Sequence, residues 1–144
     1  MKVGIVGSGN VASSLVHYLA GSDLPIETVV SARDQNKAKA AVMDAASAYP
    51  LDANKVQVLP LNELRHADLL VLGAGVQPYL LSKGELTQAN VQLTKEILDQ
   101  MQPRDSAFII ALATPVDTLT AIVQNYLGGK GHPIGESKHE WLRP

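Results

Sequence analysis

The chain has 144 residues, of which 46% are hydrophobic and 18% are charged, and its formal net charge is -2. This composition and length predict one soluble globular domain and exclude a disordered chain, while the small negative charge excludes bulk attraction to nucleic acid. The absence of cysteine excludes disulfides and zinc-thiolate sites, and no apolar run approaches the ~20 residues that span a membrane, so we expect a cytoplasmic protein.

The first half of the chain alternates short apolar runs with amphipathic segments, which predicts strands alternating with helices. A buried strand over residues 2–6 is followed by a helix from Asn10, whose apolar residues recur every four positions. A second strand covers residues 26–32, and Asp34 then caps an alanine-rich helix that runs to about Tyr49. The small residues of this helix would allow close packing on a sheet or on a second copy of the chain, as a homo-oligomer contact.

The second half of the chain continues the same alternation. Strands are predicted over residues 55–59, 68–72 and 107–112, and the last two are separated by a helix with an apolar stripe over 86–101. The final helix is predicted over residues 114–127, because it starts with a threonine cap and a proline at the first helical position.

The order of these elements predicts an α/β fold. We expect a Rossmann-type, doubly wound parallel sheet of about five strands in the order 3-2-1-4-5, with ligands at the carboxyl ends of the strands. Residues 1–127 would form this dinucleotide-binding domain, and residues 128–144 an irregular polar tail, because Pro133 makes a poor strand residue. The fifth strand would then be an uncovered sheet edge, which is a second candidate for homo-oligomer contact.

A glycine pattern, Gly7-x-Gly9-x-x-Ala12, lies between the first strand and the first helix. Gly7 permits a tight turn, Gly9 lets the backbone approach a pyrophosphate, and Ala12 lets the helix pack on the strand. The helix start at Asn10 and Val11 offers free amide donors and a positive dipole end to phosphate oxygens. The pattern predicts a dinucleotide site; the alternatives are a turn that binds nothing and a site for another adenosine-containing ligand, such as a methyl donor.

The position that chooses between NAD and NADP departs from the NAD pattern. An acidic residue at the end of the second strand would accept from both ribose hydroxyls, but Ala32 stands there. Its neighbours Ser31 and Arg33 could meet a ribose 2′-phosphate, which favours NADP or weak binding of NAD. The alternative for Arg33 is a solvated surface charge.

Several spaced motifs follow the glycine loop in order. They are a Met-Asp pair at 43–44, a strand and glycine turn over 68–75, an Asn-Val pair at 90–91, and Thr-Pro-Val-Asp over 114–117. Together with the opening strand and loop, these motifs resemble the coenzyme-binding half of the lactate/malate dehydrogenase family, over about residues 1–127.

The resemblance implies hydride transfer between NAD or NADP and a 2-hydroxy or 2-oxo acid. It implies that Gly73, Ala74 and Gly75 form the turn beside the nicotinamide, joined by Thr114, where the family has asparagine. Lys83 falls on the position of the family's carbonyl-polarising arginine, and a lysine keeps the charge but loses the planar fork. We therefore take Lys83 as the candidate catalytic residue.

The other catalytic groups of the family lie in a second domain that has no counterpart in this sequence. His17 and His66 read as surface or structural residues, and His132 and His139 fit no dependable ligand spacing, so we predict no metal site. Two functions stay open: the coenzyme domain of a lactate/malate dehydrogenase-like oxidoreductase without its catalytic half, and a non-catalytic dinucleotide-binding or cofactor-sensing module. The substrate also stays open, because residues 76–83 fit neither the lactate nor the malate pattern.

Overall fold

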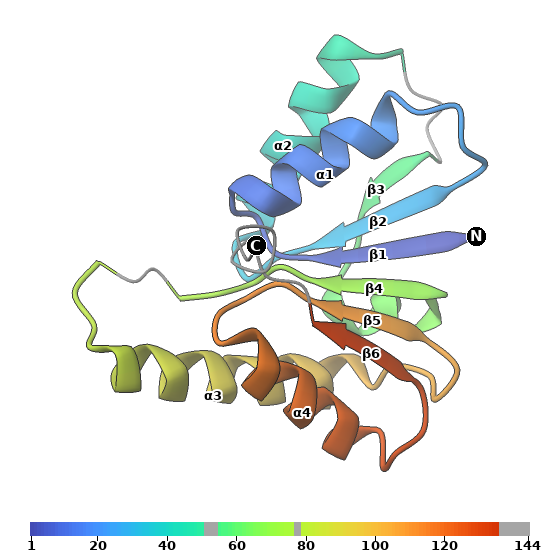
Figure 1. Ribbon diagram of the computed structural model, residues 1–144. Coiled ribbons are helices and arrows are strands. Elements are labelled where there is room, and N and C mark those ends of the chain that lie inside the picture. Colours follow the sequence, from blue (N-terminus) through green and yellow to red (C-terminus); the bar gives the residue numbers. More distant parts are fainter. Residues whose placement is uncertain (51–54, 77–78, 136–144) are drawn as a thin grey trace, which may run out of the picture.

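The computed structural model describes residues 1–50, 55–76 and 79–135. They form a single parallel sheet of six strands in the order β3-β2-β1-β4-β5-β6 (Figure 1). The strands are β1 (Lys2–Val6), β2 (Glu27–Ser31), β3 (Val56–Val58), β4 (Leu69–Leu72), β5 (Phe108–Ala111) and β6 (His132–Gly135). The predicted doubly wound arrangement is confirmed, and the strand order reverses between β1 and β4.

Helices cover both faces of the sheet. Figure 1 shows α1 and α2 over the β1–β3 half on one face, and α3 and α4 over the β4–β6 half on the other. The helices are α1 (Asn10–Ala20), α2 (Gln35–Ala48), α3 (Lys83–Met101) and α4 (Val116–Tyr126), with a 3-10 helix, η1 (Leu61–His66), before β4. Each layer buries its own apolar core, centred on residues such as Ile5 and Val16 on one face and Leu70 and Leu98 on the other. Within the described residues, no helix is long and apolar enough to cross a membrane.

The alanine-rich helix α2 uses its small residues within the chain. Ala38, Ala41 and Ala45 are its buried residues, and α2 packs on α1 and β3. Asp34 caps the helix as predicted, accepting the backbone N–H groups of Asn36 and Lys37 at 3.0 and 3.3 Å. Contact with a second copy through this helix stays a prediction.

The expectation that the sheet ends at a fifth strand is wrong. His132–Gly135 forms β6 and pairs in parallel with β5, with Pro133 opposite Ile109. A proline is tolerated here because an edge strand needs backbone bonds to one neighbour only. The edge predicted to be open at β5 is therefore covered, and the new edge is a four-residue strand with a proline, which limits pairing with another chain. Residues 136–144 of the predicted tail lie outside the described residues.

The starts of β1 and β4 are joined by Asp68. Its carboxylate accepts the Lys2 backbone N–H at 2.8 Å and a guanidinium N–H of Arg104 at 2.8 Å. The Lys2 bond, followed by the Arg104 bond, holds the pKa of Asp68 below its ordinary value. Because ionised Asp68 is favoured in the folded chain, its stabilisation is fully present above the unfolded-state pKa of about 3.9 and is lost as the pH falls through the lower folded-state pKa.

We therefore expect Asp68→Asn to lower the melting temperature at pH 7, by an amount that shrinks as the pH is lowered below about 4. Thermal melts of both proteins across this pH range measure the difference. Asp44→Asn, on the exposed side of α2, serves as the control and should change little at any pH. A penalty for Asp68→Asn that is the same at pH 7 and at low pH would contradict the role of its charge.

Candidate functional site

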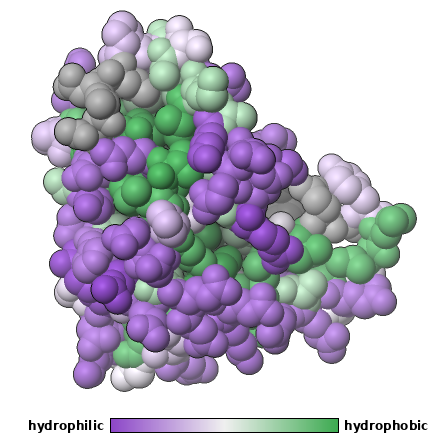
Figure 2. All heavy atoms as spheres, turned by 180° about the vertical axis from the view of Figure 1, so that it is seen from behind, coloured by the Kyte–Doolittle hydropathy of each residue, from purple (hydrophilic) through white to green (hydrophobic). Residues whose placement is uncertain are grey.

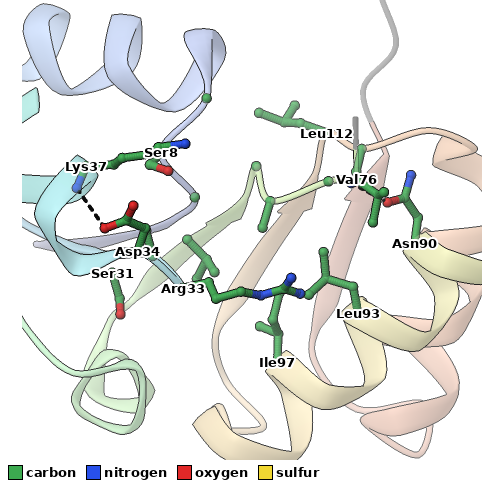
Figure 3. Close-up of a pocket in the computed structure, with 18 of the residues that line it drawn as sticks. Ser8, Ser31, Arg33, Asp34, Lys37, Val76, Asn90, Leu93, Ile97 and Leu112 are labelled. Atoms are coloured by element: carbon green, nitrogen blue, oxygen red, sulfur yellow. Dashed lines mark hydrogen bonds between the residues drawn. The ribbon is translucent and has the colours of Figure 1, made fainter. Parts of the chain in front are cut away.

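A cleft of about 1490 Å³ opens at the carboxyl ends of the strands. It extends from the start of α2, past the glycine loop, to the turns after β4 and β5 and the inner side of α3 (Figure 3). This volume exceeds the roughly 300–1,000 Å³ of a pocket for a drug-sized ligand, because the lining extends over several elements from α2 to α3. All nine residues predicted to contact a cofactor line it: Gly7, Gly9, Asn10, Val11, Arg33, Gly73, Ala74, Gly75 and Thr114.

The glycine loop is fixed to the sheet at Gly7. Its N–H donates to the carbonyl of Ser31 at 2.8 Å, and the N–H of Gly73 donates to the carbonyl of Val6 at 2.8 Å. Gly7 has φ +132°, and a Cβ at this position would lie 2.9 Å from the carbonyl carbon of Gly73. The turns after β1 and β4 therefore meet backbone against backbone, and only glycine fits between them.

Gly9 lies in open space, unlike Gly7, which is packed against backbone. It is the N-cap of α1, and a Cβ there would meet no atom within 4 Å. The first bond within the helix runs from Ser13 N–H to Gly9 C=O at 2.9 Å, so the N–H groups of Asn10 and Val11 have no partner inside the helix. No side chain of the described residues caps α1, and its first turn holds no acidic residue. The helix start therefore presents amides and a positive dipole end to the cleft.

The end of β2 carries no carboxylate. Ser31 is 1% exposed, and its hydroxyl accepts from the Gln35 amide at 3.3 Å. Ala32 follows and is also buried, and Arg33 extends from the strand end into the cleft, toward α3 (Figure 3). The carboxylate of Asp34, two residues after Ala32, accepts two backbone N–H groups of α2 through its Oδ1.

Asn90 joins the two turns on the far side of the cleft. Its side-chain oxygen accepts the Val76 N–H at 2.8 Å, and its amide nitrogen donates to the Thr114 carbonyl at 2.6 Å. It is 3% exposed and lies beside Val76 in Figure 3. The motif at 90–91 predicted no role for Asn90, although an amide within an apolar helix stripe is a signal of buried hydrogen bonding.

The predicted helix cap at Thr114 is wrong. The N-cap of α4 is Pro115, the Thr114–Pro115 peptide is cis, and the first bond of the helix runs from Leu119 N–H to Pro115 C=O at 3.1 Å. Thr114 stays in the loop, where Asn90 of α3 holds its carbonyl. A tertiary contact thus overrides the local capping preference.

Lys83 is the first residue of α3. The helix begins three residues before the predicted stripe because Ser82 and Glu85 form a capping box. The Ser82 hydroxyl accepts the Glu85 N–H at 3.2 Å, and the Glu85 carboxylate accepts the Ser82 N–H at 2.7 Å. The backbone and then the side chain of Ser82 hold the pKa of Glu85 below its ordinary value. Lys83 is exposed and is not among the residues that line the cleft. The Ser-x-x-Glu spacing was the signal for this helix start.

Residues 79–82, which lead into α3, protrude from the molecule (Figure 1). Figure 2, a view from behind, shows a mostly hydrophilic face with this segment projecting at one side and apolar atoms at its tip. Tyr79 and Leu80 are 82% and 96% exposed. Residues 77–78, within the segment expected to choose the substrate, lie outside the described residues. None of the described histidines, His17, His66 and His132, lines the cleft.

Comparison with known proteins decides the family. The family model described as the NAD-binding domain of lactate/malate dehydrogenase matches residues 1–132. The chain belongs to the lactate/malate dehydrogenase family. This confirms the resemblance drawn from the motifs, and the family places NAD as the cofactor class of this domain.

Relatives in the lactate/malate dehydrogenase family are longer than this chain. L-lactate dehydrogenase A of Rhizopus oryzae is 30% identical over 132 residues, which are 88% of this chain and 40% of that protein. A probable L-lactate dehydrogenase of Schizosaccharomyces pombe is 33% identical over 152 residues, covering 99% of this chain and 46% of its own length. The ligand-bound minor L-lactate dehydrogenase of Enterococcus mundtii has a TM-score of 0.76 at 26% identity, covering 88% of this chain and 42% of that one. The chain thus spans less than half the length of these relatives.

Proposed function

We propose that the cleft binds the dinucleotide NAD(H) or NADP(H) along its length. The observation that carries this proposal is the pairing of Gly9, open to the cleft, with an uncapped α1 start. A pyrophosphate seated there would accept from the N–H groups of Asn10 and Val11 and gain from the helix dipole. The hydrogen bond from the Gly7 N–H to the Ser31 carbonyl fixes this loop to the sheet, close to Gly73.

The nicotinamide would lie at the other end of the cleft. Gly73, Ala74 and Gly75 leave β4 there, and Thr114 leaves β5. Asn90 holds the two turns at a fixed separation. This arrangement supports a role in positioning the ring for hydride transfer.

In this proposal the chain is the coenzyme-binding part of an oxidoreductase that exchanges hydride with a 2-hydroxy or 2-oxo acid. Such a reaction needs a general acid or base within hydrogen-bond reach of the substrate oxygen. The described lining of the cleft offers no histidine, so we assign this group to another segment or another chain. The role of Lys83 in polarising the substrate carbonyl stays a prediction.

Titration with NADH and NADPH, followed by nicotinamide fluorescence, tests the proposed binding. Gly9→Val should weaken both cofactors at least tenfold, because the added side chain would occupy the space of the pyrophosphate, and should cost at most about 1 kcal/mol of stability at the N-cap. Gly84→Val is the matched control, since a Cβ at Gly84 also meets nothing but lies outside the cleft. Binding that is absent in the wild type, or unchanged in Gly9→Val, would overturn the proposal.

A non-catalytic dinucleotide-binding or cofactor-sensing module is the second candidate function. It is favoured by the position of Lys83 and of the described histidines outside the cleft lining. Oxidation of the reduced cofactor in the presence of pyruvate or oxaloacetate separates the two functions. Turnover that Lys83→Met abolishes supports the oxidoreductase. Cofactor binding without turnover supports the module only when the assay also contains the segment or chain that carries the general acid or base, because the coenzyme-binding part alone would not turn over either.

A further inference from the structure

We propose that the adenosine end of the cleft selects a ribose 2′-phosphate, so that the chain binds NADPH more tightly than NADH. This inference rests on the proposed function and assigns Arg33 as the residue that recognises the phosphate. It follows from the residues at the end of β2 and the start of α2.

The first observation is the missing acceptor for the ribose hydroxyls of NAD. Ala32 stands at the end of β2, and the Ser31 hydroxyl already accepts from Gln35. The Asp34 carboxylate accepts two backbone N–H groups of α2. A 2′,3′-diol therefore meets no carboxylate at position 32, where such a group would bond to both hydroxyls, and the Asp34 carboxylate is held at the start of α2 through its Oδ1.

Two positively charged side chains also lie at this end of the cleft. Arg33 and Lys37 both line the cleft, and Arg33 is exposed and forms no ion pair with any described residue. Figure 3 shows Arg33 reaching into the cleft. The nearby negative charges are Asp34, which caps the helix, and Glu96 on the opposite wall.

These groups match a phosphate monoester better than a diol. The planar guanidinium of Arg33 can donate two parallel N–H bonds to phosphate oxygens, and Lys37 adds a second cation. Hydrogen bonds to charged groups are the stronger ones, and one such bond corresponds to a difference in affinity of about tenfold or more. The discrimination therefore comes from attraction to the phosphate, with no compensating contact for the diol.

Fluorescence titration of the wild type should give a Kd for NADPH at least tenfold below that for NADH, with the difference shrinking as salt is added. Arg33→Ala should weaken NADPH about tenfold and change NADH by less than about twofold. Lys39→Ala, which removes a lysine of α2 that does not line the cleft, is the control and should leave both Kd values unchanged.

The reciprocal variant Ala32→Asp supplies the missing carboxylate and should reverse the preference toward NADH; a thermal melt shows that it is folded. Equal affinity for the two cofactors in the wild type, or an equal effect of Arg33→Ala on both, would overturn the inference and leave the proposed function standing. Failure of the wild type to bind either cofactor would overturn both.

Discussion

Gly7→Ala is expected to lower the free energy of unfolding by about 3 kcal/mol and to abolish dinucleotide binding. The added Cβ would require a residue other than glycine at φ +132° and would lie 2.9 Å from the Gly73 carbonyl carbon and 3.0 Å from the Ala74 nitrogen. Both contacts are with backbone, which cannot move aside as a flexible side chain can. The turns after β1 and β4 would have to separate, and the separation would carry the pyrophosphate loop out of place.

Denaturant unfolding of the purified chain measures this effect. Gly9→Ala is the matched control in the same loop, because its φ is -76° and its Cβ meets no atom within 4 Å. It should cost no more than about 1 kcal/mol, as an N-cap substitution. If the two alanine variants lost equal stability, the backbone contact between Gly7 and Gly73 would not be the reason for glycine at position 7.

Asn90→Leu is expected to lower the free energy of unfolding by about 2–3 kcal/mol. Leucine has the same number and branching of side-chain heavy atoms but makes neither hydrogen bond, so the Val76 N–H and the Thr114 carbonyl lose their partner. The two turns at the nicotinamide end would no longer be held together. We therefore expect cofactor affinity to fall as well, measured at a temperature where the variant remains folded.

A control on the same helix separates lost hydrogen bonds from altered packing. Thr94→Val, at another buried polar position of α3, should change the unfolding free energy by less than about 1 kcal/mol. Asn90→Asp keeps the acceptor for Val76 but places a buried carboxylate oxygen against the Thr114 carbonyl, so it should cost more stability at pH 7 than at low pH, where the protonated carboxyl can donate. Wild-type stability in Asn90→Leu would mean that the two turns are held by other contacts.

The proposals for the two ends of the cleft can fail separately. Gly9 tests the pyrophosphate seat, Arg33 tests the ribose end, and Asn90 tests the nicotinamide end. The three positions lie on different elements, α1, the β2–α2 turn and α3. A substitution of Arg33 should change the affinity for one cofactor only, whereas substitutions of Gly9 and Asn90 should change the affinity for both.

The sequence by itself determined the sheet's alternating strands and helices, the glycine loop and the Asp34 cap. These features depend on short-range patterns: apolar runs ended by glycine or proline, and a side chain that bonds to an amide two or three residues later. The capping box of Ser82 and Glu85 belongs to the same class and could have been predicted from its spacing. The missing acid at Ala32 was equally visible, because its place is set by the end of the second strand.

Only the tertiary structure decided the rest. Pro133 is tolerated in β6 because that strand lies at the edge of the sheet, which no local pattern reveals. Thr114 leaves its expected cap position because Asn90, 24 residues away in the sequence, binds its carbonyl. Gly7 is restricted by Gly73, which follows a different strand. In each case the deciding partner is distant along the chain, so no pattern of neighbouring residues reveals it.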